Sequence, residues 1–193
     1  MLILFDLDAD MLRVLVLALW AAGNASFLDA QRTPEPVATC HDVSLARPAY
    51  GVSYRGSVRN SDYEFSAMVP EGFTGWGAAP VAPFHGFTIY LDERETSCIV
   101  FEIRLRVGDV SAEQDAAPNE AAPIRVRVGN RSGLQTVVIG RRSGVEYQNV
   151  TVTLELPRAG YTNDAEIVLV TPMNEVARTK PIFSKFLGSF KFN

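Results

Sequence analysis

The longest regular alternation of apolar and polar residues lies in "SCIVFEIRLRV", residues 97–107. Every second position is apolar: Ile99, Phe101, Ile103, Leu105 and Val107. The positions between them include Glu102, Arg104 and Arg106. A period of two is typical of a β-strand with one face on a core and the other in water. We therefore expect a half-buried strand here, with Cys98 at its start.

Similar patterns predict further strands on both sides. Upstream, "YGVSYRGSV" is followed by "SDYEFSAMV", which ends at the turn "PEG". The apolar face of this second segment holds Tyr63, Phe65, Ala67 and Val69. Downstream, the candidates are "PIRVRVG", "LQTVVIG", "VEYQNVTVTLEL" and "AEIVLVT". In the third of these the apolar positions change from odd to even numbers, which predicts a bulge near Asn149.

The final segment, "PIFSKFLGSFKFN" at residues 181–193, changes to a helical spacing. One face of the expected helix holds Ile182, Phe183, Phe186 and Leu187. Pro181 suits the first turn of this helix, and Gly188 can stop it. Phe190 and Phe192 then alternate with polar residues, as in a short terminal strand. We expect these aromatic residues to tie the C-terminus to the core.

The first residues have the layout of a secretory signal peptide. An apolar run from Val14 to Ala22 follows Arg13 and precedes small residues. The run is too short for a mature transmembrane helix, which needs about 20 apolar residues. We predict a signal peptide at 1–25, a flexible leader at 26–39 and one globular domain at 40–193. The protein would be exported to the periplasm or the cell exterior, with no stable membrane insertion after cleavage.

Residues 1–10 do not fit this layout, because a signal peptide begins with positive charge and this stretch holds Asp6, Asp8 and Asp10. Translation from Met11 would leave Met-Leu-Arg before the apolar run. Our hypothesis is that residues 1–10 are an over-extended gene start. The alternative is that "LILFDLD" forms a buried first strand.

The net charge excludes one class of binding partner, and the two cysteines predict a disulfide. Without residues 1–25, which hold three aspartates and one arginine, the formal net charge changes from -4 to -2, so nucleic acid is not an expected partner. The arginines of "IRLRV" and "IRVRV" alternate with apolar residues and mark solvated strand faces.

In an exported chain, Cys40 and Cys98 predict a disulfide that stabilises the fold by about 4 kcal/mol. The alternative is two reactive thiols.

Both ends of the domain resemble the PsbP-like α/β/α sandwich of extrinsic photosystem proteins, a Ran-binding import factor and many bacterial periplasmic proteins and lipoproteins. Members often open with an aromatic-rich strand and a Pro-x-Gly-aromatic turn, here "YEFSAMVPEGF". They close with a helix that runs into Ser-Phe-x-Phe, here "PIFSKFLGSFKF" after "AEIVLVTPMNEVARTK". The resemblance implies an α+β fold, a mostly antiparallel sheet with a C-terminal helix packed on it. Strand count alone leaves an all-β sandwich as the alternative.

The most unusual loop is "VPEGFTGWGAAPVAPFHGF", which gathers large side chains among glycines and prolines. These side chains are Phe73, Trp76, Phe84, His85 and Phe87. As a binding site, they would form a flat apolar surface for a sugar, peptide or protein, with the histidine as a polar group. The alternative is that they cover one end of the sheet under a rigid loop.

No motif indicates catalysis or a cofactor. A hydrolase triad needs a histidine beside a serine, but the chain has only His41 and His85 and contains no Gly-x-Ser-x-Gly elbow. A zinc site needs three or four ligands, and the cysteine of "CHD" is already assigned to the disulfide. The acidic "LDERE" at residues 91–95 is read as a solvated turn, with a calcium site as the alternative. Asn130 and Asn149 lie in sequons that matter only in a glycosylating host.

The resemblance implies a binding or assembly role more often than an enzyme, because this fold carries no shared catalytic set and no functional residue can be transferred. Our leading hypothesis is an exported soluble protein that binds an unknown protein or small-molecule ligand at the loop of Trp76 and His85. The rival is a secreted hydrolase or metal-dependent enzyme that uses His85 with Asp92 or Glu93. A third hypothesis is an assembly subunit with a flat apolar patch on a sheet face.

Overall fold

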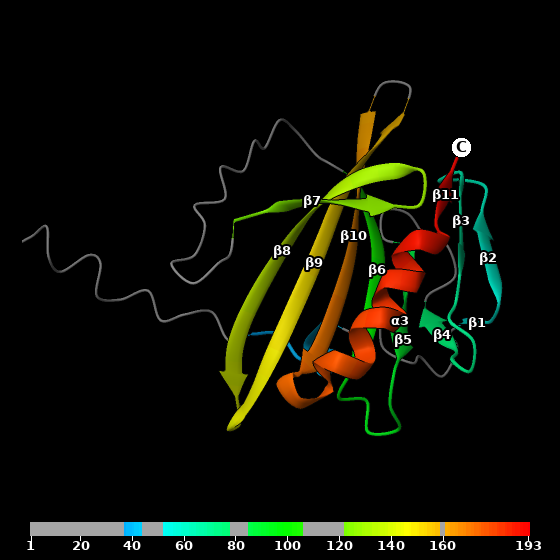
Figure 1. Ribbon diagram of the computed structural model, residues 1–193. Coiled ribbons are helices and arrows are strands. Elements are labelled where there is room, and N and C mark those ends of the chain that lie inside the picture. Colours follow the sequence, from blue (N-terminus) through cyan, green and yellow to red (C-terminus); the bar gives the residue numbers. More distant parts are fainter. Residues whose placement is uncertain (1–36, 44–51, 78–84, 106–121, 159–160) are drawn as a thin grey trace, which may run out of the picture. The chain divides into compact units, whose positions relative to one another are not determined.

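The computed structural model describes residues 37–43, 52–77, 85–105, 122–158 and 161–193 (Figure 1). The predicted signal peptide, the leader up to residue 36 and the alanine-rich acidic segment after the longest alternating strand lie outside these residues. The proposed domain limits therefore stay a prediction. Within the described part, the strands form one large and one small sheet.

The large sheet has eight strands, and all neighbouring pairs are antiparallel. In spatial order they are β1 (Val52–Tyr54), β4 (Gly75–Gly77), β5 (His85–Tyr90), β6 (Cys98–Leu105), β10 (Tyr161–Pro172), β9 (Val145–Arg158), β8 (Arg131–Arg142) and β7 (Ile124–Val128). The small sheet contains β11 (Lys191–Phe192), β3 (Phe65–Met68) and β2 (Ser57–Asn60). Three helical segments complete the described part: α2 (Cys40–Val43), the 3₁₀ turn η2 (Met173–Glu175) and α3 (Val176–Ser189).

The main core lies between one face of the large sheet and a layer formed by α3 and the small sheet (Figure 1). The alternation in β6 works as predicted, because Ile99, Phe101 and Ile103 are all completely buried. Phe190 centres the aromatic part of this core, with its ring 5.0 Å from those of both Phe101 and Phe186. A 14-residue helix thus covers the sheet, and the fold is α+β rather than an all-β sandwich.

The C-terminal segment follows the prediction on its apolar face but not at its start. Phe183, Phe186 and Leu187 are buried, as expected. The helix begins at Val176 instead of Pro181, directly after η2. Proline removes the hydrogen bond to the carbonyl four residues earlier, which belongs to Ala177. Both Ala177 and Pro181 are exposed, so water can satisfy that carbonyl and the helix continues.

The end of this helix also differs from expectation. Gly188 does not stop it, because α3 continues to Ser189, whose hydroxyl donates to Phe186 O at 2.7 Å. Phe190 then adopts an extended conformation, with ψ at 140°. The predicted terminal strand is confirmed as β11, in which Phe192 pairs with Phe65 of β3.

The bulge predicted near Asn149 is wrong. Strand β9 pairs in unbroken register with both neighbours, and Asn149 lies opposite Val138 of β8 and Val170 of β10. The apolar phase changes because β9 packs on both faces of the sheet. Val150 and the even-numbered residues after it face the main core, whereas Tyr147 packs on the opposite side.

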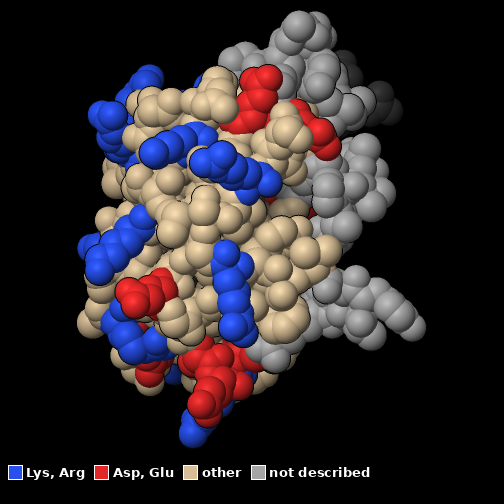
Figure 2. Space-filling view, turned by 90° about the vertical axis from the view of Figure 1, so that its right-hand side faces the viewer, with Lys and Arg blue, Asp and Glu red and all other residues tan. Residues whose placement is uncertain are grey.

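On the side of the molecule that carries the small sheet, charged side chains of both signs are scattered among uncharged ones (Figure 2). Basic side chains are spread singly over it, and acidic side chains gather towards its two ends (Figure 2). On the opposite side of the large sheet, the described helical structure is limited to the four residues of α2. A full second helical layer, as in an α/β/α sandwich, therefore stays a prediction.

Candidate functional site

The face of the large sheet opposite α3 carries a second apolar cluster, and we call it the disulfide face. Its buried members are Cys40, Tyr90, Cys98, Val100 and Val170. Four partly buried residues pack against them: Val43, Trp76, Tyr147 and Val168. The cluster exists because successive strand residues point to opposite faces, so Cys98 and Val100 point away from the main core that Ile99 and Phe101 fill.

The predicted disulfide is confirmed, with Cys40 and Cys98 joined at a Cα–Cα distance of 5.9 Å. It fixes the segment 37–43, which we call the strap, to β6. A second attachment is steric, because a Cβ at Gly140 of β8 would lie 1.7 Å from Val37 Cγ2. Glycine at that position lets Val37 approach the strand and become buried.

Charged and polar contacts complete the attachment of the strap. Thr39 donates from its backbone N–H (2.8 Å) and its hydroxyl (2.9 Å) to Asp42 Oδ2. Arg142, at the end of β8, forms an ion pair with the same carboxylate. The strap is thus tied to the β8–β9 hairpin as well as to β6.

An open hollow of about 250 Å³ lies where the strap, the β5–β6 loop and the hairpin meet. It is lined by Thr39, Cys40, His41, Glu95, Thr96, Arg142, Ser143, Val145 and Tyr147. Hydroxyl groups, an imidazole and a guanidinium provide hydrogen-bonding groups, and Tyr147 provides an aromatic wall. Among the residues that the structure describes, no group of three or more histidine, cysteine or acidic side chains could hold a metal ion. The lining groups can form hydrogen bonds to a small polar group.

A charged row crosses the disulfide face beyond the apolar cluster. Arg104 of β6 contacts Glu102 at 2.5 Å and Glu166 of β10 at 3.3 Å. Burial raises the pKa of Glu166, and the charges of Glu102 and Asp164 raise it further, whereas Arg104 opposes the shift. Glu102 and Glu166 therefore share one guanidinium.

The structure divides the residues of the predicted binding loop between the two faces of the sheet. Trp76 lies in the middle of β4, opposite Thr88 of β5, and packs on the disulfide face. Phe87 is only 2% exposed and lies in the main core, with its ring 6.2 Å from that of Phe186. Phe73 packs against the same core. Phe84 and the side chain of His85 lie outside the described residues, so the binding role of the loop stays a prediction.

The acidic turn after β5 uses its first carboxylate internally. Asp92 accepts hydrogen bonds from Thr96 N (3.0 Å), Thr96 Oγ1 (3.1 Å) and Ser97 N (2.6 Å). Burial alone would raise the pKa of Asp92, but these hydrogen bonds outweigh it and hold the pKa below its usual range. Asp92 is therefore a structural acceptor that closes the turn.

The same geometry separates the histidine and acid of the rival enzyme hypothesis. His85 begins β5 and Asp92 follows its end, so the strand His85–Tyr90 lies between them. Five extended steps span roughly 17 Å. The backbone positions of His85 and Asp92 therefore lie beyond opposite ends of β5, and the rival enzyme hypothesis stays a prediction.

Sequence reasoning missed the strap, the hollow and the part played by Tyr147. The odd-numbered apolar positions at the start of β9 were the available signal, since Tyr147 packs on the disulfide face. They were interpreted as a bulge because the sequence alone does not show that both faces of a strand are covered.

No family model matches this sequence, and no curated protein is significantly similar to it. Among solved structures, the chain is similar to LpqN of Mycobacterium tuberculosis, described as involved in cell envelope biogenesis. The TM-score is 0.54 at 13% sequence identity, over 75% of this chain and 92% of that one. The structure has an antiparallel sheet and a C-terminal helix that runs into a Ser-Phe-x-Phe strand. The resemblance implied this arrangement. The fold is PsbP-like.

Two further structures are similar at a lower level. Cyanobacterial PsbP (CyanoP) of Synechocystis sp. PCC 6803 matches with a TM-score of 0.47 and 11% identity, over 77% of this chain and 98% of that one. A protein of Bacteroides thetaiotaomicron matches with a TM-score of 0.46 and 13% identity, over 72% of this chain and 48% of that one.

None of the helices in the described ranges has the length and apolar character needed to span a membrane.

Proposed function

We propose that this protein is an exported cell-envelope protein that binds a protein or small-molecule partner on its disulfide face and performs no catalysis of its own. The observation that carries the proposal is the position of Trp76, only partly buried at the margin of the second apolar cluster. A large aromatic side chain of this kind is a frequent anchor of binding surfaces.

On the other face of the sheet the central aromatic side chains are enclosed, whereas Tyr54, Tyr63 and Phe73 pack against the core with part of their surface exposed. Phe101, Phe186 and Phe190 fill the space between sheet and α3 and are at most 1% exposed. On the disulfide face, Trp76 and Tyr147 keep part of their surface accessible. The hollow and the charged row adjoin this apolar surface and can orient a bound partner through hydrogen bonds.

The finer form of the proposal joins Trp76 with Phe84 and His85 of the predicted loop. Phe73 and Phe87 then act as core residues that hold the loop in place. The Cys40–Cys98 disulfide favours export, because disulfides persist in oxidising compartments. The similarity of the fold to that of LpqN supports the cell-envelope proposal, and the expected location of the mature protein is the periplasm or the cell exterior.

The fluorescence of Trp76 tests this function. The sequence holds two tryptophans, and Trp20 leaves with the predicted signal peptide, so Trp76 reports alone in the mature protein. We would record acrylamide quenching with and without a panel of sugars, peptides and metal ions. The proposal is supported by one class that protects Trp76 and whose affinity, measured by calorimetry, falls in Trp76→Ala but not in Met68→Ala on the small sheet. A Trp76 inaccessible to acrylamide and indifferent to every class contradicts it.

A further inference from the structure

Strand β7 forms an open edge of the large sheet. In the described part of the chain its one strand neighbour is β8, with Ile124 paired to Gln135 and Val128 to Arg131. An edge strand presents a row of backbone N–H and C=O groups that a further strand can pair with. Ile124 is 54% exposed, and Leu134 beside it on β8 is 51% exposed. These are large apolar exposures for a sheet margin.

The far end of β7 is held firmly. Val128 is completely buried, and the backbone N–H of Gly129 donates to Leu187 O of α3 at 2.9 Å. Arg127 Nε donates to Gly129 O at 2.8 Å. The edge is therefore ordered before any partner arrives, which lowers the entropic cost of pairing.

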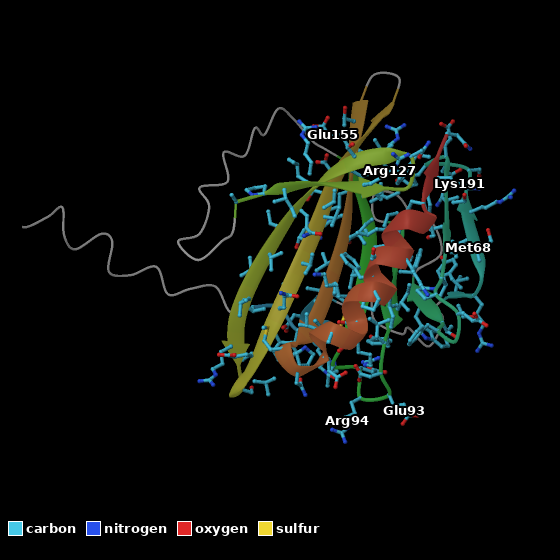
Figure 3. All side chains as sticks on the ribbon, viewed as in Figure 1. Met68, Glu93, Arg94, Arg127, Glu155 and Lys191 are labelled. Carbon is cyan, nitrogen blue, oxygen red and sulfur yellow. A yellow bond between two sulfur atoms is a disulfide. The ribbon has the colours of Figure 1, made fainter. Side chains whose placement is uncertain are left out.

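The two faces of β7 differ in chemistry. Arg125 and Arg127 lie on the side of Leu134 and Ser132, their cross-strand partners. Ile124 and Val126 lie on the side of the main core, against which Val126 packs. Figure 3 shows Arg127, Lys191 and the acidic Glu155 at the same end of the molecule. Within the described ranges, neither Arg125 nor Arg127 forms an ion pair with an acidic side chain.

This pattern disfavours pairing of β7 with a second copy of itself. The strand reads Ile-Arg-Val-Arg-Val, so any antiparallel register that sets apolar against apolar also sets arginine against arginine. Like charges directly opposite each other destabilise a strand pair. A partner strand with carboxylates at the same alternate positions turns this repulsion into attraction.

We propose that β7 is a docking edge for an extended segment of another protein that carries acidic side chains at alternate positions and apolar side chains between them. Backbone hydrogen bonds along the edge supply the pairing, Arg125 and Arg127 select the acidic face, and Ile124 contacts the apolar one. Arg125 and Arg127 lie on the same side of the sheet as Trp76, but β7 and β4 stand near opposite edges in the strand order, so β7 can hold a second partner.

Fluorescence anisotropy with synthetic peptides tests this inference. The probe is a short capped peptide of alternating glutamate and valine, and its charge control has lysine in place of glutamate. Two further peptides carry N-methyl groups on one or the other set of alternate amides. We expect binding of the glutamate peptide that weakens with salt, and loss of binding with only one of the two methylated peptides.

Variants of the protein complete the test. R125E/R127E should weaken binding of the glutamate peptide by about tenfold and favour the lysine peptide. The matched control R94E changes an exposed arginine of the β5–β6 turn and should leave both affinities unchanged. Unchanged thermal unfolding of each variant shows that it is folded. Absence of binding, equal binding of the two charged peptides or equal tolerance of both methylation patterns overturns the inference, as does a dimer that forms through β7. None of these outcomes affects the Trp76 test.

Discussion

Asn130 holds Phe192 by both ends of its side-chain amide. Its Nδ2 donates to Phe192 O at 2.7 Å, and its Oδ1 accepts from Phe192 N at 3.0 Å. The turn between β7 and β8 is thereby fastened to the C-terminal strand, 62 residues later in the chain. Asn130 also lies in a glycosylation sequon, but the nitrogen that a glycan would modify is engaged in this contact.

Removing this contact should loosen the C-terminal strand. We expect Asn130→Ala to lower the free energy of unfolding by about 1–3 kcal/mol, because Phe192 loses a partner for both backbone groups in a partly buried position. Urea denaturation measures the change. Asn174→Ala on η2 is the control, since Asn174 is exposed, and it should change stability little. Equal effects of the two substitutions would show that the contact contributes nothing.

Gly129 should tolerate no side chain. Its φ is +56°, and a Cβ would lie 1.6 Å from Phe190 O, so both backbone strain and a clash oppose substitution. We expect Gly129→Ala to destabilise the fold by about 2 kcal/mol or more. Gly188→Ala provides the contrast, because the space around it within α3 is open and alanine favours helix, so stability should rise by up to about 1 kcal/mol. Thermal and urea unfolding of both variants check the opposite signs.

Loss of the disulfide should release the strap. The two cysteines are separated by 58 residues, and the chain-entropy relation gives about 4 kcal/mol for a loop of this length. We expect the double substitution Cys40→Ala and Cys98→Ala to lose stability of this order, measured by urea unfolding of the mature protein. Trp76 packs against the same cluster, so its emission should shift to longer wavelength. Unchanged stability and emission would show that the strap stays attached through Val37 and Asp42 alone.

Asp92 should make stability depend on pH. Its pKa is held below the usual range, because hydrogen bonds from Thr96 and Ser97 to the carboxylate outweigh the effect of burial. The folded state therefore favours the ionised form. Its contribution is fully present above the ordinary carboxyl pKa and is lost as pH falls through the lower folded value. Urea unfolding between neutral and acidic pH should show this loss.

Asp92→Asn removes the ionisable group, so the variant should be less stable at neutral pH and should lack this part of the acid-dependent loss. Glu93→Gln is the matched control, because Glu93 is exposed at the next position of the same turn (Figure 3). Parallel pH profiles of wild type and Asp92→Asn would contradict the assigned role.

Several features of the fold could be predicted from the type and spacing of particular residues. Phe65, Ala67 and Val69 share a buried face, as their alternation predicts, and the disulfide was expected from two cysteines in a chain predicted to be exported. Phe183 and Phe186 face the core because helical spacing places them on one side. Such patterns reflect the local geometry of strands and helices, which the order of apolar residues already encodes.

The ends of the elements and the residues that pack against them were harder to predict from the sequence. Pro181 suits a first turn, yet α3 starts at Val176, because an exposed carbonyl tolerates the missing hydrogen bond. Tyr147 was read as a phase shift, although β9 is regular and packs on both sides. In each case the outcome depends on whether water or another part of the chain covers the element, and the local sequence does not contain this information.

The sequence by itself determined the strands with clear alternation, the amphipathic C-terminal helix and the cysteine pair, because each depends on residue type and spacing, whereas β4 and the start of β5 were taken for a loop. Only the tertiary structure decided that Trp76 of β4 and Phe87 of β5, eleven positions apart in the chain, lie on opposite faces of the same sheet. It also decided that Asn130 fastens the C-terminus and that β7 is an edge. These relationships join segments distant in the chain, and they follow from how the sheet is paired and covered rather than from any local pattern.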